Sequence, residues 1–222
     1  MKKNFLIITN QKSFIVRTFK EYKRYCNYQI YDLKKENEKK LFLKSKRKFD
    51  FLISFANGYI FRKSFLNKFS TFRRINFHPA TPNYPGRDVQ HFACYNKEKY
   101  FGGTMHIMTE KLDRGPILDV KKFKLKSKNN THEYFQKVGI RAIQNLFKKN
   151  LKKIINGNLK IRKSIKWGKK IYTRKKFLSK LGINADMKKD SLQHLVNSFY
   201  TKNHKSLYIR LFEKKFYLKL YE

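Results

Sequence analysis

Residues 75–86 have the sequence Ile75-Asn76-Phe77-His78-Pro79-Ala80-Thr81-Pro82-Asn83-Tyr84-Pro85-Gly86. The apolar residues around Asn76 and His78 predict a strand, and two residues spaced two apart in a strand point to the same face. Pro79 is expected to end that strand, because proline has no backbone N–H. An amide beside an imidazole can stabilise a developing oxyanion and exchange a proton near neutral pH. This stretch therefore predicts a site for proton transfer and oxyanion stabilisation at the end of a strand.

An acidic turn follows further along the chain. The turn Leu112-Asp113-Arg114-Gly115 is predicted to join two strands, at 102–108 and 116–123. If these strands lie beside the first one, the Asp113 carboxylate can orient the His78 imidazole and stabilise its charged form. Each residue alone also has an ordinary explanation, since a strand histidine is commonly structural and an aspartate near a glycine commonly forms a turn.

Residues that break regular backbone structure gather in this part of the chain. All four prolines and five of the nine glycines lie between residues 58 and 116. Loops of fixed conformation on a rigid scaffold commonly carry binding and catalytic groups. We therefore expect the chemistry here, with His78 and Asp113 in positions that solvent can reach.

The first two thirds of the chain predict an α/β fold. Short apolar runs alternate with longer amphipathic stretches, as in a mostly parallel sheet with crossover helices. Strands are expected at 5–9, 28–31, 49–55, 74–77, 102–108 and 116–123. Helices are expected at 13–25, 61–69 and 131–155, with a solvated helix or loop at 34–48. The long helix should begin after the N-cap Thr131 and stop at Asn156-Gly157.

Residues 158–222 lose this alternation, and we interpret them as a small C-terminal α+β appendage to a catalytic domain at 1–157. The pattern predicts short helices at 175–181 and 188–200, the second capped by Asp186 or Asp190, and a β-hairpin at 207–212 and 216–220. The apolar residues of this hairpin are expected to pack on the catalytic domain or on a second subunit, and a homodimer is favoured.

The composition supports a folded and strongly basic protein. Of 222 residues, 41% are hydrophobic and 16% aromatic, too many for a disordered tail, and the formal net charge is +39. Lysines spread along the whole chain favour a compositional origin of this charge over a selected nucleic-acid site, which stays the alternative. Two cysteines exclude a disulfide framework and favour a cytoplasmic location. No apolar run predicts a signal peptide or a membrane span, so no membrane partner is expected.

The order of these motifs resembles the formyltransferase family that uses 10-formyltetrahydrofolate. The stretch at 75–86, Gly103-Thr104-Met105-His106 and Asp113-Arg114-Gly115-Pro116-Ile117-Leu118 match that family's Asn-x-His-Pro, Gly-x-Thr-x-His and Asp-x-Gly-Pro-Ile signatures. The resemblance implies a Rossmann-like formyltransferase domain, with 10-formyltetrahydrofolate as co-substrate. It extends more loosely from residue 51 to the end of the long helix, and residues 1–50 fit only as a pattern of strands and helices.

The resemblance also implies roles for individual residues. Asn76, His78 and Asp113 fall on the catalytic amide, imidazole and carboxylate of the family, and no metal ligands are assigned. The residues implied to line the folate pocket are Asn57, Gly58, Tyr59, Ile60, Phe61 and Leu112. Substrate contacts are expected from Pro82, Tyr84 and Arg87, although Tyr84 can equally pack and Arg87 can equally be solvated. We interpret His106, which matches a family histidine, as structural.

Within that family, the sequence is most similar to the branch that formylates nucleotide-linked amino sugars for cell-surface polysaccharides such as lipopolysaccharide. Residues 9–13 lack the glycine-bearing phosphate loop of the purine-pathway members, and residues after 157 are expected to be too few for the C-terminal domain of the tRNA-specific members. A methionyl-tRNA or other amine substrate is the alternative. A basic nucleic-acid-binding protein on a degenerate enzyme fold is the alternative of another class, and otherwise nucleic acid is expected to bind only non-specifically.

Overall fold

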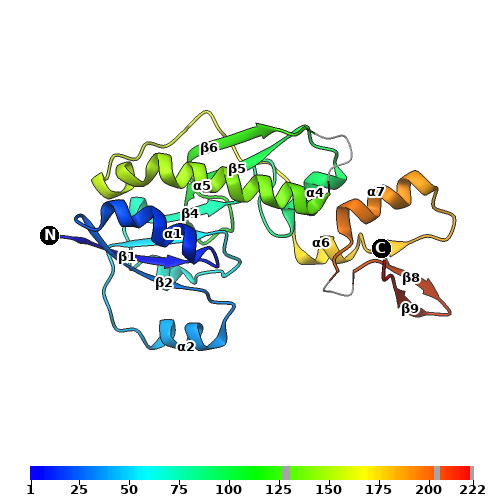
Figure 1. The fold of residues 1–222 in the computed structure, drawn as a ribbon, viewed down its shortest axis with the longest axis horizontal. Helices are drawn as coiled ribbons and strands as arrows, with labels where there is room; N and C mark the ends of the chain where they lie inside the picture. The colour runs from blue at the N-terminus through cyan, green and yellow to red at the C-terminus, as the bar shows by residue number, and fades with distance from the viewer. Residues whose placement is uncertain (127–130, 203–205, 221–222) are drawn as a thin grey trace.

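A computed structural model describes residues 1–126, 131–202 and 206–220 of the chain. Its larger sheet has six strands in the order β2-β1-β3-β4-β5-β6 (Figure 1). The strands are β1 (Lys3–Ile8), β2 (Cys26–Tyr31), β3 (Phe51–Phe55), β4 (Arg74–His78), β5 (Tyr100–Ile107) and β6 (Ile117–Lys124). Strands β1 to β4 pair in parallel, and β5 and β6 are antiparallel to their neighbours. The α/β fold with a mostly parallel sheet is therefore confirmed.

Helices cover both faces of this sheet. Side chains on a strand alternate between the faces, and the apolar side chains of each face are buried under helices. In β1, Phe5 and Ile7 belong to the hydrophobic cluster on one face, which includes residues of α1 (Lys12–Phe19) and α5 (His132–Asn156). Leu6 and Ile8 belong to the cluster on the other face, with residues of α2 (Glu36–Lys44) and α3 (Lys63–Leu66). Figure 1 shows α1 and α5 on the side of the sheet opposite α2.

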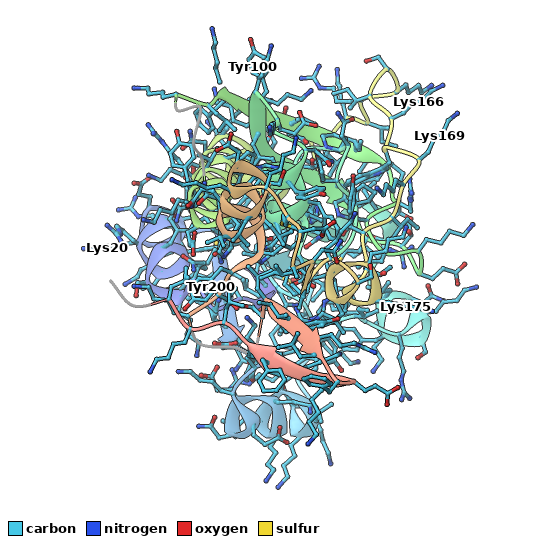
Figure 2. The ribbon with its side chains drawn as sticks, turned by 90° about the vertical axis from the view of Figure 1, so that its right-hand side faces the viewer. Lys20, Tyr100, Lys166, Lys169, Lys175 and Tyr200 are labelled. Carbon is cyan, nitrogen blue, oxygen red and sulfur yellow. The ribbon has the colours of Figure 1, made fainter. Side chains whose placement is uncertain are left out.

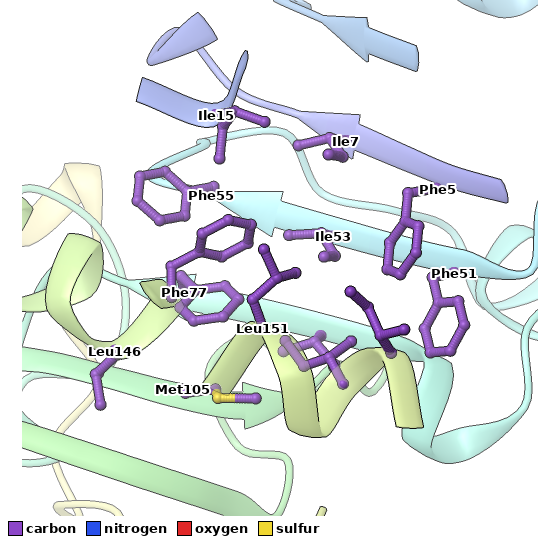
Figure 3. Close-up of a cluster of buried hydrophobic side chains, with 14 of the residues drawn as sticks. Phe5, Ile7, Ile15, Phe51, Ile53, Phe55, Phe77, Met105, Leu146 and Leu151 are labelled. Carbon is purple, nitrogen blue, oxygen red and sulfur yellow. The ribbon is translucent and has the colours of Figure 1, made fainter. Parts of the chain in front are cut away.

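Helix α5 has the ends that the sequence predicts. The Thr131 side chain accepts a hydrogen bond from the Tyr134 N–H, and Gly157 ends the helix with a left-handed φ of 75°. Its buried face packs on the centre of the sheet, where Figure 3 shows Leu151 close to the strand residues Ile53 and Phe77. This long helix supplies the largest helical contribution to the core on that face of the sheet.

The helix predicted at 13–25 is shorter in the structure. Helix α1 ends at Phe19 and is followed by a 3₁₀ turn, η1 (Lys20–Tyr22). Residues 23–25 are exposed, so extending the helix would bury no further apolar surface. The Tyr25 carbonyl oxygen instead accepts a hydrogen bond from Lys3 N–H, which leads the chain into β2.

The sequence did not predict helix α4 (Val89–Tyr95), which lies just after the proline-rich stretch. Five of its seven residues are buried, so it has no polar face to produce a helical period. The predicted helix at 61–69 is likewise reduced to α3, which is followed by the 3₁₀ turn η2 (Thr71–Arg73). Helices as short as α3 and α4 are not distinguished from loops by hydrophobic periodicity.

Residues 158–222 contribute α6 (Arg174–Leu178), α7 (Lys189–Phe199) and a second sheet of β7 (Gly182–Ile183), β8 (Tyr208–Leu211) and β9 (Lys214–Tyr217). The hairpin of β8 and β9 lies at the opposite end of the long axis from the N-terminus (Figure 1). One hydrophobic cluster joins α6, β7, α7 and β8 to Ala80, α4 and Phe135, and it includes Phe177, Phe199 and Leu207. The predicted cap of α7 was wrong, since Lys188 is the N-cap residue and Asp190 lies in the first turn.

Basic residues project from several sides of the molecule. In Figure 2, Lys20 lies on one side and Lys166 and Lys169 lie on the opposite side, with Lys175 below them. A selected phosphate-binding face would instead concentrate these charges on one surface. Within the described ranges, no helix combines the length and apolar character needed to cross a membrane.

Two buried histidines stack where α4, α5 and α7 meet. The rings of His91 and His132 are 4.2 Å apart between centroids and inclined by 21°. His91 Nδ1 donates to the Ser198 carbonyl oxygen in α7 at 2.7 Å. Burial is the main cause that lowers the pKa of His91 from 6.5 to about 3, and the charge of His132 is the second. The folded protein thus favours the neutral ring.

We predict that this pair weakens the fold in mild acid. Because the unfolded chain binds a proton near pH 6.5 and folded His91 does not, stability is full above pH 6.5 and falls as the pH drops toward 3. We expect this residue to account for a loss of roughly 1–2 kcal/mol between pH 7 and pH 5. Urea unfolding at both pH values checks this: the loss should shrink in His91→Phe and persist in His194→Phe, a variant of a partly exposed histidine. Equal losses in all three proteins would contradict it.

Candidate active site

Strand β4 carries two side chains of the candidate site at its carboxyl end. Asn76 pairs with His106 of β5, and His78 pairs with Thr104, in the antiparallel register. Asn76 and His78 are two residues apart and therefore share a face of the sheet. The strand ends at His78, directly before Pro79, as the sequence predicts.

Asp113 reaches this pair from the loop between β5 and β6. Its Oδ2 lies 3.5 Å from His78 Nδ1, and its Oδ1 lies 3.3 Å from both Asn76 Nδ2 and His106 Nε2. The Gly86 N–H donates to Oδ2 at 3.0 Å. One carboxylate thus joins β4, β5 and two loops.

The surroundings of Asp113 hold it in its ionised form. Burial alone would raise the pKa of this carboxyl group, because it penalises the charged state. The nearby charge of His78, the hydrogen bond and charge of His106 and the Gly86 N–H outweigh that penalty, and the pKa falls below its ordinary value of 3.8. Asp113 is therefore a carboxylate at neutral pH.

The two rings of the site are fixed by backbone carbonyl groups. His78 Nε2 lies 2.8 Å from the Tyr84 carbonyl oxygen, and His106 Nδ1 lies 2.9 Å from the Ile107 carbonyl oxygen. Because a carbonyl oxygen can only accept, each of these ring nitrogens carries the hydrogen. The other nitrogen of each ring, His78 Nδ1 or His106 Nε2, then faces Asp113.

A cavity of about 250 Å³ opens onto this cluster. Asn76, His78, His106 and Asp113 form part of its wall. The expectation that solvent reaches His78 and Asp113 freely needs correction, since these residues are only 5% and 4% exposed. Both are buried between the sheet and its loops, and the cavity is the approach to them that the structure shows.

The cavity wall includes all the residues expected from the sequence to bind folate. These are Asn57, Gly58, Tyr59, Ile60, Phe61 and Leu112. They come from the loop after β3 and the loop before Asp113, two segments far apart in the chain. Arg87, expected to contact substrate, also lines the cavity and is exposed. The sequence did not indicate two further cations of the wall, Lys34 and Lys111.

The other two expected substrate contacts lie elsewhere. Pro82 is buried and is not part of the cavity wall. Tyr84 is 2% exposed, and its ring stacks on Tyr172 at 5.0 Å while its hydroxyl donates to Glu98. The tyrosine ring is enclosed by packing, which leaves no face for a nucleotide base. Its backbone carbonyl, in contrast, fixes His78.

Two contacts of this cluster were missed by the sequence analysis. The Gly86 N–H is a backbone group, so no residue pattern marks it as a donor to Asp113. Interpreting His106 as structural overlooked that Nε2 lies within 3.3 Å of both Asn76 and Asp113. The motif match at His106 was the available signal for that contact.

The chain belongs to the formyl transferase family, because the family model described as "Formyl transferase" matches residues 3–148. The family proposed from the sequence motifs is thereby confirmed.

Curated relatives match a shorter region. A methionyl-tRNA formyltransferase of Borrelia hermsii is 34% identical over 113 residues, which is 50% of this chain and 36% of the relative. A methionyl-tRNA formyltransferase of Hydrogenobaculum sp. is 32% identical over 112 residues, again 50% of this chain and 36% of the relative. The match thus spans about a third of the length of these relatives.

Solved structures match the fold over nearly the whole chain. A sugar N-formyltransferase from Shewanella sp. has a TM-score of 0.79 at 21% identity, covering 98% of this chain and 97% of that chain. An N-formyltransferase from Helicobacter canadensis has a TM-score of 0.72 at 18% identity, covering 97% and 86%. At these identities the likeness shows a shared fold, which includes the C-terminal elements.

We predict that Gly86 is required for the geometry around Asp113. Its φ is +116°, and an added Cβ would lie 2.0 Å from the Tyr172 carbonyl oxygen. Gly86→Ala should therefore lower the free energy of unfolding by about 1–3 kcal/mol. Gly58→Ala is the matched control in the same cavity wall, where a Cβ meets nothing within 4 Å, and it should change stability by less than about 0.5 kcal/mol. Equal effects in denaturant titrations of the two variants would contradict this.

Proposed function

We propose that this chain transfers a formyl group from 10-formyltetrahydrofolate to a primary amine. The observation that carries the proposal is the convergence of Asn76, His78 and Asp113 at the wall of one cavity. A carboxylate, an imidazole and an amide in contact supply the proton carrier and oxyanion donors that acyl transfer to an amine needs. Membership of the formyl transferase family supports the same reaction.

The cavity suits a ligand with several hydrogen-bonding groups. Asn57 Nδ2 and Asn76 Oδ1 are buried and have no hydrogen-bond partner among the described residues, and both asparagines line the cavity. Buried polar atoms without partners carry a cost that a ligand can remove. The 57–61 segment and Leu112 would hold the folate, a proposal supported by the Helicobacter canadensis structure, described as a complex with folinic acid and dTDP-3-aminofucose.

The residues of the cluster divide the chemistry between them. The amine nitrogen bonds to the formyl carbon, and the carbonyl electron pair moves onto oxygen, where the Asn76 Nδ2–H group and the His78 imidazole stabilise it. His78 acts from Nδ1, because Nε2 is held by the Tyr84 carbonyl oxygen. The oxyanion then reforms the carbonyl and expels folate N10. Asp113 holds the His78 imidazole and helps to move the proton released by the amine to N10.

For the amine we propose an amino sugar linked to a nucleotide. The sugar N-formyltransferase structure and the N-formyltransferase structure with dTDP-3-aminofucose each match 97% or more of this chain, and so the similarity includes the elements after residue 157. The cationic side chains of Lys34, Arg87 and Lys111 line the cavity, and a nucleotide diphosphate is anionic. Methionyl-tRNA is the second candidate, favoured by the curated relatives of the catalytic region.

A cytoplasmic location, the homodimer, a role in lipopolysaccharide synthesis and the division at residue 157 remain predictions. For the dimer, the supporting feature is the outer surface of the β8–β9 hairpin. Leu211, Phe212 and Phe216 are exposed there, whereas Leu207 at its base is buried in the shared core.

We predict that the Asp113 carboxylate and the His78 imidazole are required for formyl transfer. Asp113→Asn and His78→Gln should each lower kcat by about 10²–10⁴-fold, the range for a general acid or base. Asparagine tolerates the left-handed φ of 46° at position 113. Asp119→Asn is the matched control: this carboxylate pairs with Lys149 and Asn150, away from the cavity wall, and its loss should leave kcat unchanged. Wild-type kcat in folded Asp113→Asn would overturn the assignment.

We also predict the preferred amine. At about 0.2 M salt, where charge-driven binding to tRNA weakens, nucleotide-linked amino sugars should be formylated and aminoacylated initiator tRNA should not. Mass spectrometry of a substrate panel detects the added formyl group directly. Efficient turnover of the tRNA alone would overturn the sugar assignment but keep the formyl transfer chemistry. Tight salt-resistant RNA binding by a protein that formylates nothing would favour a nucleic-acid-binding role.

A further inference from the structure

Trp167 contacts the catalytic cluster from outside the cavity. It is the single tryptophan of the chain and lies in the segment between α5 and α6. Its ring meets the His106 ring edge-on at 5.0 Å and 89°, and the His78 ring at 6.1 Å and 63°. Trp167 is not part of the cavity wall, although both histidines are. It therefore touches the site without facing the substrate.

The same indole holds the loop of Asp113. Trp167 Nε1 donates to the Gly115 carbonyl oxygen at 2.7 Å. The Arg114 guanidinium, one residue after Asp113, donates to the carbonyl oxygens of Gly168 (2.6 Å) and Lys169 (2.9 Å). Three hydrogen bonds thus connect the Asp113 loop to the segment that starts at Trp167.

This segment, residues 167–172, also binds the proline-rich loop, and we call it the 167–172 strap. Gly168 N–H donates to the Pro82 carbonyl oxygen at 2.9 Å. At its other end, Tyr172 N–H donates to the Pro85 carbonyl oxygen, and Arg87 N–H donates to the Tyr172 carbonyl oxygen, both at 2.9 Å. The loop held in this way supplies the Tyr84 carbonyl to His78 and the Gly86 N–H to Asp113.

The bonds of the 167–172 strap maintain an uncommon backbone conformation at Asp113. Asp113 has a positive φ of 46°, which is uncommon for a residue with a side chain and persists only where the surroundings enforce it. The bonds from Trp167 and Arg114 act on the two residues that follow Asp113. Releasing them would let the carboxylate turn away from His78 and Asn76. A shift of about 1 Å in a reacting group can cost on the order of 10²-fold in rate.

We propose that Trp167 is a positioning residue for formyl transfer, which fixes the Asp113 loop through Gly115 and packs against the rings of His78 and His106. This role rests on the proposed function. The indole acts through its neighbours, so it sets the rate of the reaction and leaves the affinity for both substrates nearly unchanged. Its apolar ring also keeps water from one side of the two imidazoles, which strengthens their interaction with Asp113.

A fluorescence measurement tests the contact without any substrate. Trp167 is the single tryptophan of the sequence, so emission excited at the red edge of tryptophan absorption reports the surroundings of this indole. The rings of His78 from β4 and His106 from β5 contact the indole, and its N–H binds the loop of Asp113 and Arg114 at Gly115. Removing either ring should therefore change the emission intensity at a fixed pH.

Variants assign that change to the site. His106→Gln and His78→Gln should each alter the emission of Trp167, whereas His194→Gln, whose ring stacks on Tyr95, should not. Emission that is identical in wild type and in both site variants would show that Trp167 does not contact these rings in solution, and would overturn the proposal.

Kinetics test the positioning role itself. Trp167→Phe keeps an aromatic ring but loses the N–H donor, and we expect its kcat to fall about tenfold. Trp167→Leu loses both the ring and the donor, and we expect its kcat to fall about 10²-fold. KM for folate and amine should change by less than about twofold in both, because Trp167 does not line the cavity. Lys169→Ala is the control, since Arg114 binds the Lys169 backbone carbonyl and not its side chain. If Trp167→Leu fails to fold, Trp167→Phe decides the question.

The outcomes separate this role from the proposed function. Wild-type kcat in a folded Trp167 variant, or a raised KM at unchanged kcat, overturns the positioning role and leaves formyl transfer intact. A wild-type protein that formylates no amine overturns the function and this role with it.

Discussion

The buried carboxylate of Asp113 is the contact on which the rest of the candidate site depends. It lies within 3.5 Å of His78, Asn76, His106 and the Gly86 N–H, which come from two strands and a separate loop. A negative charge with so little exposure is tolerable only with several charged or hydrogen-bonding partners. The same requirement brings the chemistry-bearing groups together and keeps the carboxyl group ionised at neutral pH.

The position of the site follows from the construction of the sheet. Strand β4 is the last parallel strand, and its antiparallel neighbour β5 runs back along it. His78 at the carboxyl end of β4 therefore pairs with Thr104 in the middle of β5, and the loop after β5 must fold back along these strands to bring Asp113 to His78. Packing of α5 on these strands holds them rigidly, with Gly139 against the Pro79 carbonyl, where a Cβ would lie 2.2 Å away.

The elements after residue 157 take part in the site as well as in the core. Trp167 and Gly168 connect the Asp113 loop to the proline-rich loop. Phe177 and Phe199 complete a hydrophobic cluster with residues of α4 and α5. This region thus contacts both loops of the candidate site and is more than a peripheral attachment. The positive charge, by contrast, is spread over several sides and identifies no single partner (Figure 2).

The sequence by itself determined the α/β class, the long helix α5 with its Thr131 cap and Gly157 stop, and the choice of Asn76, His78 and Asp113 as candidate site residues, which the structure brings together. These features follow from local period, capping and motif order, which are written in consecutive residues. Only the tertiary structure decided that Tyr84 is enclosed by Tyr172 and that helix α4 exists. It alone placed the Gly86 N–H and the Trp167 indole against the site. These depend on contacts between distant segments and on backbone groups that every residue carries, so no local pattern records them.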